Sequence, residues 1–361
     1  MNTSLTLTAG VAAPPPTAAA PPTVTRLVLE TTARVCRRTR HVRTCAAGVS
    51  RLAASLEGRA HLLARAPGPS PEPDLFSSDE RQAQFLFVAA SVNFSFWPDD
   101  EAQRWHWPHA PGKGCTDRCP PGCRPRTGAI ALGLSLRDAV RRGVPVTDAS
   151  YLRRLTPPEF EELLGGSGRL PMLEERTQVI NEAGRVLSRL FGGEIATLVR
   201  LASRSADDAL ALLLHNFPSF RDVSVLDGMP VYFLKRAQIF IADLFRAFAG
   251  RGLGRFDDVR RLTALPDYRL PQVLRAAGAI EYSPQFARHV DACFPLRADS
   301  REEIELRAAT VQAVDALRAE LVRRTGEDVL ACLLDNELWR LAHDDEFGDL
   351  LPHHRSRTIF Y

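Results

Sequence analysis

A short stretch between two prolines carries the side chains best suited to catalysis. Pro266 and Pro271 bracket a carboxylate, a phenol and a guanidinium, at Asp267, Tyr268 and Arg269. Proline fixes φ and removes a backbone donor, so the segment is a stiff connector, and Pro271 suits the first turn of a following helix. A carboxylate held near a helix N-terminus either caps the helix or takes part in chemistry. The composition of this stretch favours a catalytic Asp267.

Lysine is rare in this chain, and its position is informative. Of the 46 basic residues, 44 are arginine and only Lys113 and Lys235 are lysine. Arginine is a wide planar fork whereas lysine is a slim point charge, so a lysine in such a chain indicates a role that arginine cannot fill. Lys113 lies in a Pro/Gly-rich stretch, but Lys235 begins a strongly patterned segment. Lys235 is therefore a candidate functional residue, with an ordinary surface lysine as the alternative.

The segment 98–127 is rich in Cys, Pro and Gly and is expected to be an exposed insert. Three cysteines and two histidines lie in it, at His106, His109, Cys115, Cys119 and Cys123. Thiolates and imidazoles bind zinc, but the cysteine spacing is wider than the usual CxxC pair. The sequence also contains no P-loop, strand-linked GxGxxG, HExxH or GxSxG motif. We therefore expect neither a metal nor a cofactor, and the zinc reading stays an alternative.

Several separate pieces of the chain resemble the queuosine salvage proteins, the queuosine 5′-phosphate N-glycosylases. In chain order the pieces are residues 93–98, 147–152, 173–176, 217–222, 235–239, 267–272, 303–307 and 354–361. The resemblance runs over nearly the whole chain from about residue 26. It implies a mainly helical protein, similar in shape to helical DNA glycosylases, which releases queuine from queuosine 5′-monophosphate for reuse in tRNA. The chain departs from the family pattern at Leu265-Pro266 and in the Cys/Pro insert, which affects loop geometry more than chemistry.

The implied reaction defines what the site must supply. Cutting a base from ribose develops an oxocarbenium ion at C1′, which a nearby carboxylate stabilises or attacks, and Asp267 is the expected catalytic residue. Queuine is a 7-deazaguanine, so protonation at N7 is closed and another acid or donor must assist the leaving base. The resemblance places Asp335 and His41 near the base for this purpose. The alternatives are a helix-surface acid for Asp335 and a solvent-exposed histidine in a basic run for His41.

Further side chains are expected around the substrate. The implied 5′-phosphate needs positive charge and N–H donors, which Lys235 suits by its charge and by the dipole of the helix that it begins. Asp243 is expected to hold Lys235 or Arg269 in place, and aromatic faces are expected to sandwich the base. The available rings are Phe233, Trp97 and Trp339. The expected substrate-binding set is therefore His41, Phe233, Lys235, Asp243, Tyr268, Arg269, Asp335 and Trp339.

The elements that must position these residues are mainly helices. Three capping signals, each a Thr or Ser followed three residues later by Glu or Asp, predict helix starts at Thr156, Ser205 and Ser300. One segment breaks the helical pattern, because alternating apolar residues flank an Asp-Gly pair. That pattern predicts a β-hairpin over 223–233, followed by a helix over 234–249 that begins near Lys235. The fold class expected is a single, compact, mainly α domain with a small β element.

Composition bounds the remaining possibilities. A chain of 361 residues with 45% hydrophobic and 25% charged residues is ordinary for a globular protein, and no apolar run reaches the 18 or more residues of a transmembrane helix. Residues 1–24 are uncharged and Ala/Pro-rich, so we expect disorder there, with only weak organelle-targeting character, and a domain over 25–361. Seven unevenly spread cysteines favour a reducing compartment, and we expect a cytoplasmic monomer.

Three functions compete at this point. The first is the salvage hydrolase, the second a DNA-glycosylase-like nucleic-acid enzyme, and the third a helical interaction protein without catalysis. A nucleic-acid enzyme needs a broad basic groove and binding that falls steeply with salt, whereas the net charge is only +3. The basic run 34–43 is read as a solvated helix face, with a nucleic-acid arm as the alternative. Charge balance and the rigid Asp267 segment favour the hydrolase, which takes a small-molecule substrate and makes no direct nucleic-acid contact.

Overall fold

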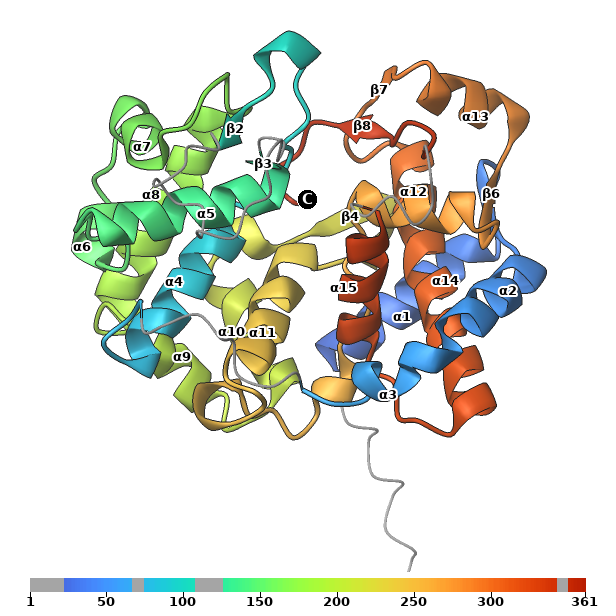
Figure 1. Ribbon diagram of the computed structural model, residues 1–361, viewed down its shortest axis with the longest axis horizontal. Helices are drawn as coiled ribbons and strands as arrows, with labels where there is room; N and C mark the ends of the chain where they lie inside the picture. Colours follow the sequence, from blue (N-terminus) through green and yellow to red (C-terminus); the bar gives the residue numbers. More distant parts are fainter. Residues whose placement is uncertain (1–22, 67–74, 108–125, 343–349) are drawn as a thin grey trace, which may run out of the picture.

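The computed structural model describes residues 23–66, 75–107, 126–342 and 350–361, and Figure 1 shows their arrangement. The described part is mainly α-helical, as predicted, with small two-stranded sheets. Most of the uncharged N-terminus and the cysteines at 115, 119 and 123, with His109, lie outside the described residues. None of the described helices combines the length and apolar character needed to cross a bilayer.

The helices follow one another along the whole described chain. Their bounds are α1 (Val24–Cys36), α2 (Ala46–Leu56), α3 (Ala60–Leu63), α4 (Asp79–Ser91), α5 (Gly128–Arg141), α6 (Ala149–Leu152), α7 (Pro157–Leu164), α8 (Leu173–Leu190), α9 (Ile195–Leu201), α10 (Ala206–Asn216), α11 (Lys235–Ala247), α12 (Arg269–Ala276), α13 (Pro284–Asp291), α14 (Arg301–Thr325) and α15 (Ala331–Leu341).

The strands are short and pair two by two. They are β1 (Val42–Thr44), β2 (His106–Trp107), β3 (Arg126–Thr127), β4 (Val223–Leu226), β5 (Met229–Tyr232), β6 (Ile280–Tyr282), β7 (Pro295–Leu296) and β8 (Arg355–Ser356). The pairs β1–β6, β2–β3 and β4–β5 are antiparallel, and β7–β8 is parallel. The predicted hairpin is confirmed as β4–β5, and its turn residues Asp227 and Gly228 both have positive φ, as a type I′ turn requires.

The three predicted helix starts are confirmed by their hydrogen bonds. Thr156 and Glu159 form the capping box of α7, and the hydroxyls of Ser205 and Ser300 accept the N–H groups of the residues three positions later. Each cap satisfies a backbone donor that the helix itself leaves free. The signals were reliable because a cap is a local interaction, decided by residues three positions apart.

The core consists of two hydrophobic clusters that share α4. The larger cluster takes residues from α1, α2, α9, α10, α11, α14 and α15, and the smaller one mainly from α5 and α7. Helix α4 contributes Phe87 and Ala90 to the larger cluster and Phe85 and Val88 to the smaller. Figure 1 shows α5, α6 and α7 on one side of the molecule and α1, α2 and α14 on the other.

A glycine contact holds α2 against the end of α12. A Cβ added at Gly48 would lie 1.7 Å from the carbonyl oxygen of Gly278, which is backbone and cannot rotate away. We expect Gly48→Ala to destabilise the protein by about 1–3 kcal/mol or more, the range for overpacking. Urea unfolding measures the change. Gly58→Ala is the matched control, because a Cβ at Gly58 meets no atom within 4 Å, and equal losses in both variants would refute the steric explanation.

Candidate active site

A cavity of about 520 Å³ opens between α4 and α5 on one side and α11 and α15 on the other. Its size suits a nucleotide-sized ligand. Seven of the residues singled out from the sequence line it, namely Lys235, Asp243, Asp267, Tyr268, Arg269, Asp335 and Trp339. They come from α11, from the connector that precedes and begins α12, and from α15, so three segments far apart in the chain meet at one cavity.

Asp267 lies at the cavity wall, with 8% of its surface exposed. Its Oδ1 accepts hydrogen bonds from the backbone N–H groups of Arg269 (2.7 Å) and Leu270 (3.1 Å), at the start of α12. The capping alternative is therefore real, but it occupies one oxygen. Among the described residues, both donors to this carboxylate bond to Oδ1, and Oδ2 faces no such donor. One carboxylate can thus fix the helix with one oxygen and present the other to a ligand.

Lys235 is the first residue of α11 and is buried, with 4% of its surface exposed. Its Nζ donates to the carbonyl oxygen of Asn93 at 3.2 Å, and its backbone N–H donates to Oδ2 of Asp222 at 3.0 Å. Burial lowers the pKa of Lys235, while the charge of Asp267 raises it. The ammonium group is therefore only partly satisfied by protein, and an anion in the cavity would favour its charged form.

Asp335 enters the cavity from α15 and is 5% exposed. Its Oδ1 accepts the backbone N–H of Leu265 at 2.7 Å. Burial raises the pKa of Asp335 well above its ordinary value, and the nearby charge of Asp267 raises it further, although the bond from Leu265 acts in the opposite direction. A raised pKa favours the protonated carboxyl, which is the form that can donate a proton to a ligand.

The remaining polar residues form pairs along the wall. Asp243 lies 3.1 Å from Nη1 of Arg246, whereas the sequence reading expected it to hold Lys235 or Arg269. Arg269 instead donates to Oε1 of Gln272 at 3.0 Å. Burial raises the pKa of Tyr268 to about 12, so this phenol stays neutral and can donate a hydrogen bond.

Two predicted substrate contacts do not line the cavity. His41 precedes β1, where its Nε2 lies 3.7 Å from Oε1 of Glu302 and its backbone N–H bonds to Glu305. Phe233 is fully buried, and the guanidinium of Arg307 lies 4.0 Å from the centre of its ring. The third ring proposed for the base, Trp97, is also buried outside the lining. Neither the basic run 34–43 nor the positions of Phe233 and Trp97 in the sequence indicate whether these side chains face the cavity.

Comparison with known proteins shows the family of this chain. Residues 73–361 match the family model of the queuosine salvage protein. The chain belongs to the queuosine salvage protein family. A relative from Sphaerobacter thermophilus, named queuosine 5′-phosphate N-glycosylase/hydrolase, is 37% identical over 92% of this chain and 97% of its own length. Relatives of the same name from Bos taurus and Mus musculus are each 33% identical, over 83% and 79% of this chain and 90% and 83% of their own lengths.

Other residues of this family member line the cavity without having been singled out as ligand contacts. The aromatic and polar ones among them are Phe85, Phe94, Phe96, Arg104, Thr127, Arg137, Asn93, Arg246, Asn336 and Tyr361. Asn93, Phe94 and Phe96 lie within the piece 93–98, which carries the resemblance, and Asn336 follows Asp335 directly. Those positions were recoverable from the sequence. Tyr361 lies within the piece 354–361 and was recoverable in the same way, although only the fold shows that it packs beside Arg307.

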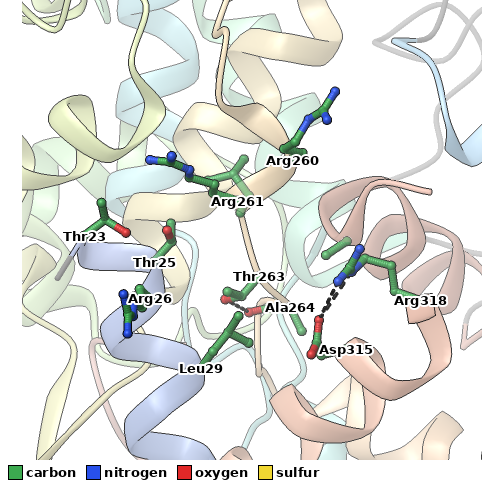
Figure 2. A pocket seen from close by; sticks show the side chains of 12 residues that line it. Thr23, Thr25, Arg26, Leu29, Arg260, Arg261, Thr263, Ala264, Asp315 and Arg318 are labelled. Atoms are coloured by element: carbon green, nitrogen blue, oxygen red, sulfur yellow. Dashed lines mark hydrogen bonds and ion pairs between the residues drawn. The ribbon is translucent and has the colours of Figure 1, made fainter. Parts of the chain in front are cut away.

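A second cavity, of about 390 Å³, lies against α1 and the segment 260–264. Figure 2 shows its arginines, with Arg318 bonded to Asp315. Each of its four guanidinium groups has an acidic partner, in the pairs Arg26–Glu30, Arg260–Asp328, Arg261–Asp207 and Arg318–Asp315. Its charges are neutralised in pairs, and the acid that lines it, Asp315, is bound by Arg318, so this cavity lacks the groups for glycosidic chemistry. The candidate site is therefore the larger cavity.

Behind the larger cavity, Glu303 gives the protein a pH-dependent stability. It is 2% exposed and lies 3.6 Å from Nη1 of Arg307. Burial raises its pKa from 4.5 to about 7, against the charge of Arg307. Folding therefore favours the protonated carboxyl, so the stability that this carboxyl contributes is complete below about pH 4.5 and is lost as the pH rises through about 7.

We expect Glu303→Gln to flatten this dependence, because Gln mimics the protonated form at every pH. The difference in the free energy of unfolding between Glu303→Gln and wild type should shift in favour of the variant by on the order of 2 kcal/mol from pH 5 to pH 8. Urea unfolding of both proteins at the two pH values measures the difference. Parallel stability curves would show that Glu303 does not titrate in this range.

Proposed function

We propose that this protein hydrolyses the N-glycosidic bond of queuosine 5′-monophosphate and releases the base queuine for salvage into tRNA. The observation that carries the proposal is the meeting of Asp267, Lys235 and Asp335 in one nucleotide-sized cavity. The relatives are named queuosine 5′-phosphate N-glycosylase/hydrolase, which supports this substrate and the cleavage of its N-glycosidic bond. In the reaction the bond from C1′ to the base nitrogen breaks, the base takes up a proton, and water adds to C1′.

Asp267 is assigned to the sugar. As the bond breaks, positive charge develops at C1′ and the ring oxygen, and a carboxylate beside them stabilises it. The position of Asp267 supports this role, because two backbone N–H groups hold Oδ1 in place. A group fixed before the substrate arrives does not have to reorganise during the reaction, which is the basis of electrostatic catalysis.

Asp335 is assigned to the departing base. The base is a 7-deazaguanine, so its five-membered ring offers no N7 to protonate and the proton must reach another edge. Burial raises the pKa of Asp335, which supports a neutral carboxyl that donates to the base. Because His41 lies outside the cavity lining, Asp335 is preferred to it as the acid.

Lys235 is assigned to the 5′-phosphate. A lysine at the first position of a helix adds its own charge to the positive end of the helix dipole. Its pKa is lowered by burial, and a phosphate would reverse that effect and hold the ammonium charged. Tyr268, Arg269, Asp243 and Trp339 complete the proposed contacts from the surrounding wall.

We further infer that the protein acts as a cytoplasmic monomer on a small nucleotide and does not bind nucleic acid directly. The near balance of 46 basic and 43 acidic residues supports a small substrate over a polyanion. The uneven cysteines support a reducing compartment. Size-exclusion chromatography with light scattering tests the monomer, and fluorescence anisotropy with labelled tRNA tests the absence of binding.

The decisive experiment is incubation of the purified protein with queuosine 5′-monophosphate, with mass detection of free queuine. We expect release of the base in the presence of EDTA, because no metal or cofactor is assigned a role. The dephosphorylated nucleoside and a DNA duplex carrying a damaged base are run in parallel. Salt-sensitive release from DNA alone would indicate a nucleic-acid enzyme, and no release from any substrate would indicate an interaction protein.

A further inference from the structure

A buried guanidinium connects the two sides of the cavity from behind. Arg307, in the long helix α14, is 1% exposed. It forms a bidentate pair with Asp222, in which Nη1 and Nη2 donate to Oδ1 and Oδ2 at 2.9 and 2.6 Å. Its Nε donates to the carbonyl oxygen of Pro266 at 3.2 Å. One planar group therefore contacts two segments that lie 44 positions apart in the chain.

Both segments carry residues of the proposed active site. The carboxylate of Asp222 that binds Arg307 also accepts the backbone N–H of Lys235, at the start of α11. The carbonyl of Pro266 belongs to the same peptide unit as the nitrogen of Asp267. The chain of bonds thus runs from the backbone of Lys235 through Asp222 and Arg307 to the backbone of Asp267.

The surroundings of Arg307 fix the plane of its guanidinium. The rings of Phe233 and Tyr361 lie 4.0 and 4.3 Å from Cζ, and arginine stacks on aromatic faces. Phe233, expected from the sequence to contact the base, has this supporting contact instead. A buried ion pair is weak evidence for stability, since apolar residues of the same volume often serve as well. Its distinctive property is geometry, because the fork fixes two partners at a set distance and angle.

We propose that Arg307 is a positioning residue of the active site, which holds the peptide of Asp267 at a fixed spacing from the start of α11 and Lys235. This inference rests on the proposed hydrolase function. The two links act on different residues. The bond from Nε to Pro266 positions Asp267, and the pair with Asp222 positions Lys235. A displacement of reacting groups by about 1 Å costs rate far more than binding.

Arg307→Lys separates the two links. A lysine keeps the positive charge and can still pair with Asp222, but a single ammonium cannot also reproduce the fork that reaches Pro266. We therefore expect the single-turnover rate at saturating substrate to fall by at least about tenfold, with the substrate dissociation constant changed by less than about threefold. A purely structural role would lower the melting temperature without lowering the rate per folded molecule.

The matched control is Arg275→Lys. Arg275 also forms a bidentate pair, with Asp291, and stacks on an aromatic ring, Tyr282 at 4.5 Å, but it lies outside the cavity lining. Its replacement should leave the rate within about twofold of wild type. Rates are measured with queuosine 5′-monophosphate, and folding is followed by circular dichroism.

Each outcome decides between the two roles. A folded Arg307→Lys protein with a rate within twofold of wild type overturns the positioning role. If this variant does not fold, Asp222→Glu replaces it, because it keeps both charges but lengthens the carboxylate arm, and the same tenfold criterion on the rate applies. Failure of both variants to fold makes Arg307 a structural residue and overturns the proposal. Absence of turnover by wild type refutes the hydrolase function itself, which is a separate result.

Discussion

Asp267→Asn is expected to lower the single-turnover rate of queuine release by at least ~10²-fold, the scale for removal of one electrostatic stabiliser. The amide keeps an oxygen that can accept the two N–H groups at the start of α12, and Asn caps helices about as well as Asp. Stability should therefore hardly change. Affinity should also hardly change, because the ground-state sugar carries no positive charge for the carboxylate to attract.

The control for this prediction is a second capping aspartate. Asp148 accepts the N–H groups of Ser150 and Tyr151 at the start of α6 in the same manner, and it does not line the cavity. Asp148→Asn should leave the rate unchanged. An Asp267→Asn protein that binds substrate and keeps most of its rate would transfer the catalytic role to Asp243 or Asp335.

Lys235→Ala is expected to weaken binding of queuosine 5′-monophosphate much more than binding of the nucleoside. A charge-assisted contact contributes roughly 1.5–3 kcal/mol, which corresponds to about 10- to 150-fold in the dissociation constant. The nucleoside should lose less than about threefold. Isothermal titration on an Asp267→Asn background measures both constants without turnover.

Lys235→Met separates charge from volume in the same assay. Methionine fills most of the space of the lysine stem without the ammonium, and it keeps the backbone N–H that bonds to Asp222. We expect it to discriminate between the two ligands as Lys235→Ala does. Equal losses for nucleotide and nucleoside in both variants would show that Lys235 does not recognise the phosphate.

The sequence predicted the local features of this site well. Helix caps, the Asp-Gly hairpin and the start of α11 at Lys235 depend on residues a few positions apart, so their signals are complete in the sequence. Asp267 was recognisable because prolines stiffen its segment, and its placement at the start of α12 follows from the same residues. The catalytic role of Asp267 stays a prediction until the variants are measured.

Long-range placement could not be predicted in the same way. The pair between Arg307 and Asp222 joins residues 85 positions apart, and nothing near either residue indicates the other. His41 is a second case, because the resemblance placed it near the base and only the fold shows that it lies beside Glu302, outside the cavity lining. The packing of distant segments decides which face of a helix or strand lines the cavity. Local sequence patterns do not indicate that packing.

Helix α4 has a consequence for how the molecule unfolds. It gives one face to each hydrophobic cluster, through Phe87 and Phe85 respectively, and Leu86 and Ala89 lie on the cavity wall. Because α4 packs against both clusters, disorder in one cluster removes contacts that hold α4 in place for the other. We therefore expect both clusters to unfold in one cooperative transition. Because a bound ligand contacts the shared helix, occupancy of the cavity should raise the temperature of that whole transition and not that of one half.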